Sequence, residues 1–486
     1  MRTKAVPVIL VILLLVLVGG VFLRSPTEHV TSVASPTGVE PVTEAGSVSS
    51  EAGPNVSAGA STSAGVSAPV PTAPAPFPRQ LRIAGLGWDM MSAGILARDG
   101  ELPREAASLK KQGLDARFGV LDAEGLEAAL ARGGADERGV DIAILPLPRF
   151  VASYEKLKAL DPVVFLVVGW IEGRDVILTK QKDFEPAPTA TVKLRAKAGS
   201  GGAYAAVFGL EMAGVTPDRV SFVGEADAWD VAALSKRESK DAKAHVLFTT
   251  AEASRLIPIV AVAQGSFVAK HEATVTAFAQ AWFAGQQGVA EDAAGAARRI
   301  AKEQGELEPL GILEGLGELG PASLGENTAL MGLSGRGAGT LERVFDRIWR
   351  SWRGSNLVGV PPERAPLDSR IVAAVVRGGG DLKPPPTKTD KGTKSPTEKP
   401  LLVYRAPKGA LNEDLLLETA AFLAEAFPRS PVRVTIHRGA DVDAKATAVT
   451  TARCIERFGL QPGRMAEGKA RAKNGAAATV EVLPIP

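Results

Sequence analysis

The chain has 486 residues, of which 45% are hydrophobic and 23% charged, and 56 Lys and Arg against 54 Asp and Glu leave a formal net charge of +2. At ~100–200 residues per domain the length allows several domains with sizeable cores, and the balanced charge gives no global field to attract nucleic acid. A single cysteine, Cys454, and four scattered histidines exclude a disulfide framework, an Fe–S cluster and a cysteine zinc site. We therefore expect no metal centre, no cofactor and no nucleic-acid partner.

The first 24 residues are typical of a membrane-inserting segment. A short basic start precedes an uninterrupted apolar run over residues 5–23, and Arg24 follows. About 20 apolar residues span a bilayer, and the Lys/Arg bias places the N-terminus in the cytoplasm. Residues 1–24 are therefore predicted to be an uncleaved signal anchor in the cell inner membrane, with the bulk of the chain in the periplasm. The alternative is a cleaved signal segment, which would leave a periplasmic protein.

Two low-complexity stretches divide the rest of the chain. Residues 25–78 are rich in Ser, Ala and Pro and hold no Lys or Arg, which predicts a disordered tether, with a loop of a folded domain as the alternative. Residues 378–400 form a second, Pro- and Lys-rich linker, interpreted as a solvated spacer or as a contact for anionic wall polymer or lipid. Residues 79–377 and 401–486 remain as the folded regions.

Residues 79–377 begin with alternating strands and helices. A strand over 81–86 ends in a glycine turn, and residues 88–94 lead into a helix. A second turn and strand follow over 113–118, then a helix over 126–130 and a strand over 140–144 that ends at Pro146-Leu147-Pro148. This spacing predicts βαβ units and a largely parallel sheet, whose ligands bind beyond the carboxyl ends of the strands.

The same pattern starts again further along the chain. The apolar run 163–171, which includes Trp170, is interpreted as core or as a hinge between lobes. After it we expect a strand over 192–196, the glycine turn 199–202 and a helix over 203–212. A strand over 220–223, a helix over 231–234 and a strand over 245–248 complete the series. Two α/β halves of like design predict two lobes with a cleft between them.

Residues 79–370 resemble periplasmic substrate-binding proteins of ABC transporters of the nitrate/sulfonate/taurine and thiamine-precursor type. The resemblance is carried by the strand–turn opening, by "EGLEAALARGGADERGVDIAILPLP", by "KAGSGGAYAAVFGLEMAGVTPDRVSFVGEADAWDVAAL" and by "GSFVAKHEATVTAFAQAWFAG". The family's acidic residue before a second-lobe strand is replaced around Ala244-His245, and its Trp-x-Pro is absent. The resemblance implies an α/β, two-lobed periplasmic binding protein fold.

The expected ligand site lies at the turns that face the cleft. The N–H groups of a helix N-terminus can hold an anionic group, and glycine allows close approach of the backbone; the alternative is a plain turn that binds nothing. Trp88 either stacks on a flat ligand or caps the core, and Glu252 beside Thr249 either contacts ligand or is ordinary loop polarity. The predicted ligand-binding residues are Trp88, Asp89, Met90, Pro146, Leu147, Ser200, Gly201, Gly202, Thr249 and Thr250.

Residues 401–486 have the order strand, helix, strand, helix, strand, which predicts a small α/β sandwich. A helix starts at 411–414, residues 432–437 alternate as a half-buried strand, a second helix ends at Gly459, and residues 480–482 lie in the last strand. The stretches "LVYRAPKGALNEDLLLETAAFLAEAFPRSPVRVTIHRGAD" and "CIERFGLQPGRM" resemble the OmpA-like peptidoglycan-binding domain.

That resemblance is incomplete at the positions that would bind peptidoglycan. It implies Asp441 as the carboxylate that meets the diaminopimelate amine, whereas the family's helix arginine falls near Thr447. Lys445 is a substitute without the fork geometry of arginine. A degenerate domain without wall binding is the alternative.

The sequence predicts an exported, membrane-tethered solute-binding protein that captures a small anionic or zwitterionic solute for an ABC permease or sensor, with peptidoglycan as a further partner. A cell-envelope structural or interaction protein with a non-binding cleft is the alternative. An enzyme is disfavoured, because His245 and His271 are isolated and give no constellation for acid–base work.

Overall fold

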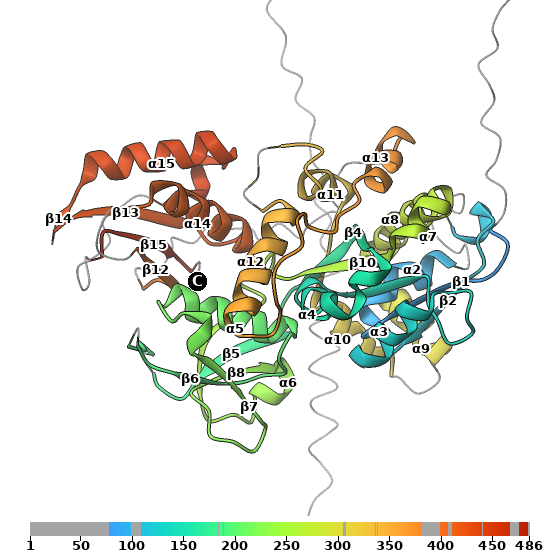
Figure 1. The fold of residues 1–486 in the computed structure, drawn as a ribbon, viewed down its shortest axis with the longest axis horizontal. Coiled ribbons are helices and arrows are strands. Elements are labelled where there is room, and N and C mark those ends of the chain that lie inside the picture. The colour runs from blue at the N-terminus through green and yellow to red at the C-terminus, as the bar shows by residue number, and fades with distance from the viewer. Residues whose placement is uncertain are drawn as a thin grey trace, which may run out of the picture. The chain divides into compact units, whose positions relative to one another are not determined.

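The structure is a computed structural model, and it describes residues 77–98, 108–182, 184–187, 189–304, 308–335, 337, 339–380, 399–406, 411–439, 441–466 and 476–484. These residues all lie within the compact unit 71–486 and form three β-sheets (Figure 1).

The first sheet has six strands and forms the centre of what we call lobe 1. Its parallel part joins β1 to β2 and β3, while β10 is antiparallel to β3 and β4, and β11 is antiparallel to β4. The strands in spatial order are β11 (Leu319–Pro321), β4 (Pro162–Ile171), β10 (Pro258–Gln264), β3 (Ile142–Pro146), β1 (Leu81–Gly85) and β2 (Ala116–Val120).

Helices surround this sheet. The 20-residue α8 packs against α2, α9 and α13, and α4 follows β3 directly. The helical elements are η1 (Asp89–Met91), α2 (Ser92–Arg98), η3 (Lys110–Gln112), α3 (Ala123–Arg132), α4 (Leu147–Leu157), η4 (Lys158–Leu160), α7 (Gly265–Lys270), α8 (Glu272–Glu291), α9 (Ala293–Gln304), α10 (Pro309–Leu316), α11 (Leu324–Leu330), α12 (Leu341–Gly354) and α13 (Arg370–Arg377).

The second sheet has five strands and forms lobe 2. Its strands in spatial order are β7 (Val220–Val223), β6 (Val192–Arg195), β8 (Val231–Ser235), β5 (Asp175–Thr179) and β9 (His245–Thr249). β6 is parallel to β7 and β8, and β5 is antiparallel to β8 and β9. Its helices are α5 (Gly201–Met212), η5 (Pro217–Arg219) and α6 (Lys236–Ser239).

The two sheets share one topology. In each, an antiparallel strand (β10 in lobe 1, β5 in lobe 2) is inserted beside the third parallel strand, and it is the first strand that the chain forms on arriving from the other lobe. The chain therefore passes between the lobes twice, through residues 172–174 and residues 250–257, which we call the first and second crossing segments. This arrangement confirms the predicted two-lobed α/β architecture.

Helix α5 is apolar around its whole circumference, and the fold buries it on every side. Ten of its twelve residues are buried, which is typical of a helix enclosed by other elements rather than lying on a surface. It contacts the sheet of lobe 2 through β8 and β5, and it also contacts α4, α12 and β12. Phe208, in the middle of α5, packs against Phe422 with ring centroids 5.8 Å apart.

The third sheet belongs to the C-terminal residues. Its strands in spatial order are β12 (Leu402–Ala406), β15 (Ala478–Val482), β13 (Val432–Arg438) and the two-residue β14 (Asp441–Val442), all antiparallel. Helices α14 (Glu413–Ala426) and α15 (Ala444–Phe458) pack on it, and η6 (Pro462–Arg464) precedes β15 (Figure 1). The predicted order of strands and helices is confirmed, with β14 as an addition.

Two expectations from sequence need correction. Residues 231–234 are not a helix but form β8 in the middle of the lobe 2 sheet, where Val231 and Leu234 are buried between β6 and β5. The sheets are mixed rather than largely parallel, because each accepts an antiparallel strand. For the run 163–171, which was predicted to be core or hinge, the structure has a core strand, and the crossing between lobes lies just after it.

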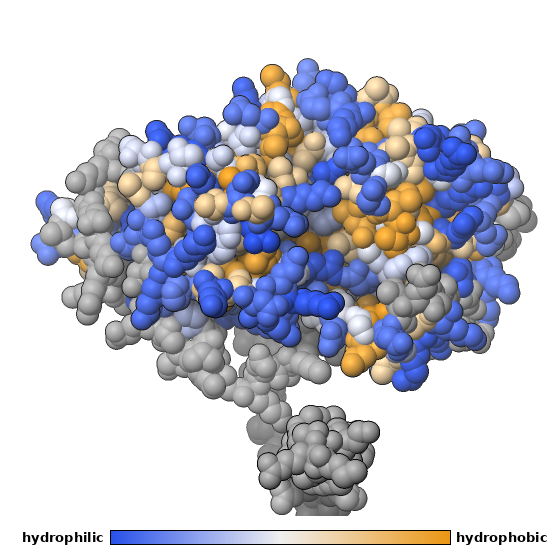
Figure 2. All heavy atoms as spheres, turned by 90° about the horizontal axis from the view of Figure 1, so that it is seen from below, coloured by the Kyte–Doolittle hydropathy of each residue, from blue (hydrophilic) through white to orange (hydrophobic). Residues whose placement is uncertain are grey.

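The predicted signal anchor, almost all of the tether over 25–78, and the centre of the 378–400 linker lie outside the described residues. Within the described part of the chain, no helix combines the length and the apolar character that a membrane span requires. The face seen in Figure 2 is mainly hydrophilic with separate hydrophobic patches. Among the described residues, Leu310 and Val360 are the most exposed large apolar side chains, at 68% and 74%.

Candidate functional site

Some of the predicted site residues contact the first crossing segment. Arg174 pairs with Asp89, the first residue of η1 in lobe 1, and the Arg174 Nε lies 3.5 Å from a carboxylate oxygen of Glu318. Asp89 and Glu318 are both in or beside lobe 1, so the guanidinium ties this segment to that lobe. Neighbouring Trp88 is half-buried against the core and Met90 is buried.

Thr250 holds the first crossing segment to the second. Its buried hydroxyl accepts hydrogen bonds from the N–H groups of Gly173, at 3.1 Å, and Asp175, at 3.0 Å. The hydroxyl of Thr249 instead donates to Glu252 at 3.2 Å, and that carboxylate also accepts from the Thr249 N–H. Both threonines therefore fix the backbone where the chain passes between lobes.

The N-terminal turn of α5 lies against the same segments. Ser200 caps the helix by accepting a hydrogen bond from the Ala203 N–H at 3.1 Å. A side chain at Gly202 would place its Cβ 2.8 Å from Asp175 Oδ1, and one at Gly201 would meet Ile171 at 3.1 Å. Gly199 has a φ of 77°, and a Cβ there would lie 2.8 Å from the Ala152 Cβ of α4 and 3.7 Å from the Arg149 guanidinium. Glycine is thus needed here for close packing.

Two buried polar atoms flank this turn without partners among the described residues. One is Oδ2 of Asp175, from lobe 2, and the other is Nε of Arg149, from lobe 1. Burial raises the pKa of Asp175 to about 6, opposed by the charge of Arg174 and reinforced by Glu318. A carboxylate and a guanidinium on either side of a helix N-terminus form a pair of opposite charges with unused hydrogen-bonding capacity.

Arg149 is held in place by Glu127 of α3. The Glu127 carboxylate pairs with Arg149, accepts from the Ser153 hydroxyl, and lies 3.0 Å from the Lys156 ammonium. Burial alone would raise the pKa of Glu127, but the bonds from Ser153 and Lys156 and the charge of Arg149 lower it. The guanidinium is thereby oriented at the end of α4.

Pro146 and Leu147 lie at the junction of β3 and α4, where both are buried. Pro146 is the last residue of β3 and is paired with Ile259 of β10, and Leu147 is the first residue of α4. These two residues present no polar group except their backbone. The structure thus brings predicted residues Asp89, Gly202 and Thr250 to the first crossing segment and the start of β5. Asp175 and Arg149, which were not predicted, are the charged neighbours of the α5 turn.

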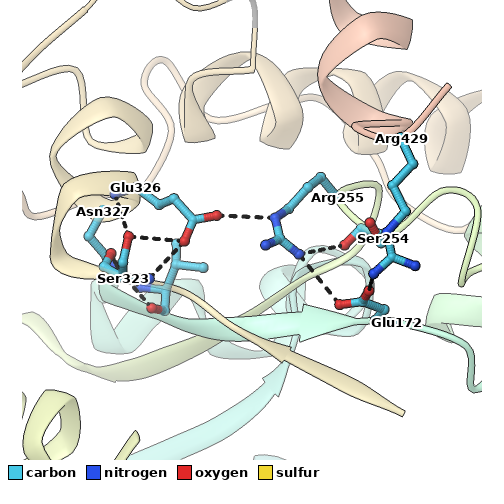
Figure 3. Close-up of polar contacts among 8 residues, drawn as sticks. Glu172, Ser254, Arg255, Ser323, Glu326, Asn327 and Arg429 are labelled. Carbon is cyan, nitrogen blue, oxygen red and sulfur yellow. Dashed lines mark hydrogen bonds and ion pairs between the residues drawn. The ribbon is translucent and has the colours of Figure 1, made fainter. Parts of the chain in front are cut away.

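Figure 3 shows a second layer of charges that lines the crossing segments. Arg255 of the second crossing segment binds Glu326 through Nε at 3.1 Å and lies 3.7 Å from Glu172 of the first. Glu172 also accepts from Arg429, which follows α14, at 2.9 Å. The Arg255 N–H donates to the Ala426 carbonyl at 3.1 Å. Residues after β12 therefore hold both crossing segments.

Sequence reasoning missed Arg149, Asp175 and Arg255. A usable signal was present at Glu172-Gly173-Arg174-Asp175, where three charged residues directly follow a long apolar strand. Charged residues that end a buried strand must find partners or water. These residues lie close to α5, which begins only at Gly201. This proximity depends on how the chain crosses between the lobes, and it cannot be predicted from spacing along the sequence.

The residues expected to meet peptidoglycan are both exposed. Asp441 lies in β14 opposite Arg438, and Lys445 lies in the first turn of α15. Thr447, at the position of the expected arginine, accepts a hydrogen bond from the Ile436 N–H at 2.9 Å and so joins α15 to β13. No cluster of metal-ligating side chains occurs in the described residues.

No protein-family model matches the chain, and no curated protein matches it. Solved structures that are similar include a periplasmic sulfonate-binding protein SsuA from Methylobacillus flagellatus, with 16% identity, 64% of this chain and 98% of that chain covered, and a TM-score of 0.43. The aliphatic sulphonate binding protein SsuA from Escherichia coli has 14% identity, coverage of 66% and 98%, and a TM-score of 0.39. The nitrate-binding protein NrtA from Synechocystis has 12% identity, coverage of 60% of this chain and 92% of that chain, and a TM-score of 0.39. These values are too low to transfer a ligand or a residue role to this chain.

Proposed function

We propose that the chain is an exported solute-binding protein that holds a small zwitterionic solute between its lobes for an ABC permease or a sensor. The observation that carries the proposal is the pair of buried, unpartnered atoms, Arg149 Nε and Asp175 Oδ2, on either side of the α5 N-terminal turn. An acidic group of the solute would face Arg149 and the helix N-terminus, and an ammonium group would face Asp175.

The position of Asp175 distinguishes a zwitterion from a simple anion. A carboxylate beside a helix N-terminus already compensates the positive end of the helix dipole. A solute with only negative charge would then meet repulsion from Asp175, whereas an ammonium group would supply the hydrogen bonds that Oδ2 lacks. Leaving either buried atom unpaired is costly, and this favours a ligand that carries both charges.

The finer parts of the proposal concern location. The apolar run 5–23 would anchor the protein in the inner membrane, and Asp441 with Lys445 would contact peptidoglycan. Membrane fractionation of the full chain against a chain with charged residues placed in 5–23 tests the anchor. Pull-down on purified cell wall, with Asp441→Asn as the variant, tests the wall contact.

A thermal-shift screen of the full chain tests the solute. It uses amino acids, taurine and betaine as zwitterions, and nitrate, phosphate and alkanesulfonates as anions. A ligand that binds only the folded state stabilises it by about 2.7 kcal/mol at 100 times its Kd, which is readily measured. We expect a zwitterion to bind and Asp175→Asn to weaken it at least about tenfold, since 1.4 kcal/mol corresponds to a factor of ten. Asp241→Asn, an exposed change of the same charge in lobe 2, should leave binding unaltered.

A cell-envelope structural protein is the second candidate. The observation in its favour is that the protein's own side chains cover the α5 turn, with Ala152, Ile171 and Ile257 all close to the glycines. If neither zwitterions nor anions shift the transition, the structural function is favoured. If anions bind and Asp175→Asn does not change their affinity, the protein would still be a solute-binding protein, but the proposal of a zwitterionic solute would be contradicted.

A further inference from the structure

A cavity outside the interlobe site lies between α12 and α14. Its volume is about 230 Å³, far above the ~10–15 Å³ that accommodates one water molecule. The lining residues come from the two helices and are Arg343, Asp346, Arg347, Arg350, Glu418 and Phe422. The cavity thus has one wall from the helix after lobe 1 and one from the C-terminal residues.

Three arginines supply most of the charge of this cavity. Arg343, Arg347 and Arg350 stand at positions i, i+4 and i+7 of α12, a spacing that places them on one face of the helix. None of them forms an ion pair with a carboxylate of the described residues: Arg350 donates from Nε to the Asp346 carbonyl at 3.4 Å. The Arg347 guanidinium instead lies over the Phe422 ring, 4.2 Å from its centroid.

The surroundings of Arg347 leave its charge under-compensated. Burial lowers the pKa of Arg347, while Tyr204, Glu211 and Glu418 oppose that effect and Arg350 adds to it. Burial also raises the pKa of Glu211 to about 7, so this carboxyl is partly neutral near pH 7 and compensates the arginine less. Arg347 therefore carries a partly desolvated positive charge that stays available to a ligand.

We propose that this cavity binds a small organic oxyanion, which the guanidinium groups of Arg343, Arg347 and Arg350 hold by charge-assisted hydrogen bonds. Guanidinium groups present several N–H donors in a fixed plane that matches carboxylate and phosphate oxygens. Phe422, which is buried beneath the Arg347 guanidinium, supplies the apolar part of the lining. The bound anion would connect α12 with α14.

Asp346 and Glu418 determine which anions fit. These two carboxyl groups share the lining with three guanidinium groups, so the cavity has a surplus of one positive charge when all five are ionised. Burial and the neighbouring Glu342 raise the pKa of Asp346, which reduces its competition with a bound anion. A compact anion with oxygens on one side and carbon on the other satisfies the arginines without meeting both acids.

Isothermal titration calorimetry on the full chain at constant ionic strength tests the proposal. The probes are citrate, inorganic phosphate and the neutral polyol glycerol. We expect saturable binding of citrate or phosphate but not glycerol, and a loss of affinity of at least about tenfold in Arg347→Met. The double variant Arg343→Gln with Arg350→Gln changes two exposed side chains and keeps the test valid if Arg347→Met misfolds.

The control is Arg353→Gln, an exposed arginine of the same helix that does not line the cavity. Binding by citrate alone assigns carboxylates, and binding by phosphate alone assigns phosphates; both results support the site. Absence of saturable binding by either anion overturns it, as does binding that all cavity variants retain. An equal loss in Arg353→Gln would identify non-specific attraction and also overturn it. Asp175→Asn should leave this binding unchanged, which separates the cavity from the interlobe solute.

Discussion

The partly buried Glu211 should make the protein less stable as pH rises through neutrality. Its Oε2 accepts a hydrogen bond from the Ser351 hydroxyl at 3.0 Å, and burial raises its pKa from 4.5 to about 7 in spite of the charges of Arg347 and Arg350. The folded protein therefore binds this proton more tightly than the unfolded chain does. Stability from this group is fully present below pH 4.5 and is lost as pH rises through about 7.

The size of the effect follows from the difference in pKa. A difference of about 2.5 units at 1.36 kcal/mol each gives an upper value of about 3 kcal/mol in the free energy of unfolding. Glu211→Gln keeps an acceptor for the Ser351 hydroxyl and has no proton to lose. At pH 8 we expect this variant to be more stable than the parent by about 2–3 kcal/mol, and at pH 4.5 the advantage should disappear.

Urea unfolding of both proteins at a series of pH values between 4.5 and 8 measures this difference. The matched control is Glu456→Gln, a change of the same kind at an exposed position of α15. The control should show no comparable dependence on pH. A difference between parent and Glu211→Gln that is flat over this range, or that grows toward acid, would refute the reasoning.

Three further changes test the packing around the lobes. Asn327→Ala should cost about 2–4 kcal/mol in urea unfolding, because the buried amide bonds both the N–H and the carbonyl of Val167 in β4; a cost below about 0.5 kcal/mol would contradict this. Gly202→Val should cost about 1–3 kcal/mol, since its Cβ would lie 2.8 Å from Asp175 Oδ1, and an unchanged urea midpoint would be the contrary result. Deleting 401–486 should uncover apolar surface on α5 and increase the fluorescence of a hydrophobic dye, whereas an unaltered signal would mean that α5 needs no cover.

The sequence was informative wherever a pattern is local. The strand that begins at Leu81 and the strand over 432–437 are set by neighbours in the chain, and the structure has both. The alternation of the second strand holds only at its start, because Thr435 and His437 are buried while Ile436 is half-buried. The burial of α5 also follows from a local pattern, since no face of this helix carries a polar stripe.

Other features depend on contacts that are distant in sequence. The four-residue segment that begins at Val231 is too short to distinguish a helical period from a buried strand. Its two alanines favour a helix, but pairing with β6 and β5 makes it a strand. The approach of Asp175 to Gly202 likewise arises only after the chain has crossed between lobes. For that reason Asp175 and Arg149 were recognised only in the structure and not from the glycine turn in the sequence.

The bonds from the C-terminal residues to the two crossing segments have a mechanical consequence. Any rotation of one lobe against the other must turn the backbone near Glu172 and Arg255, and these residues are bound by Arg429 and by the Ala426 carbonyl. A pulling force applied to the C-terminal residues would act on these two bonds as well as on the packing of Phe422 against Phe208. Force on the C-terminal residues would therefore change how easily one lobe rotates against the other.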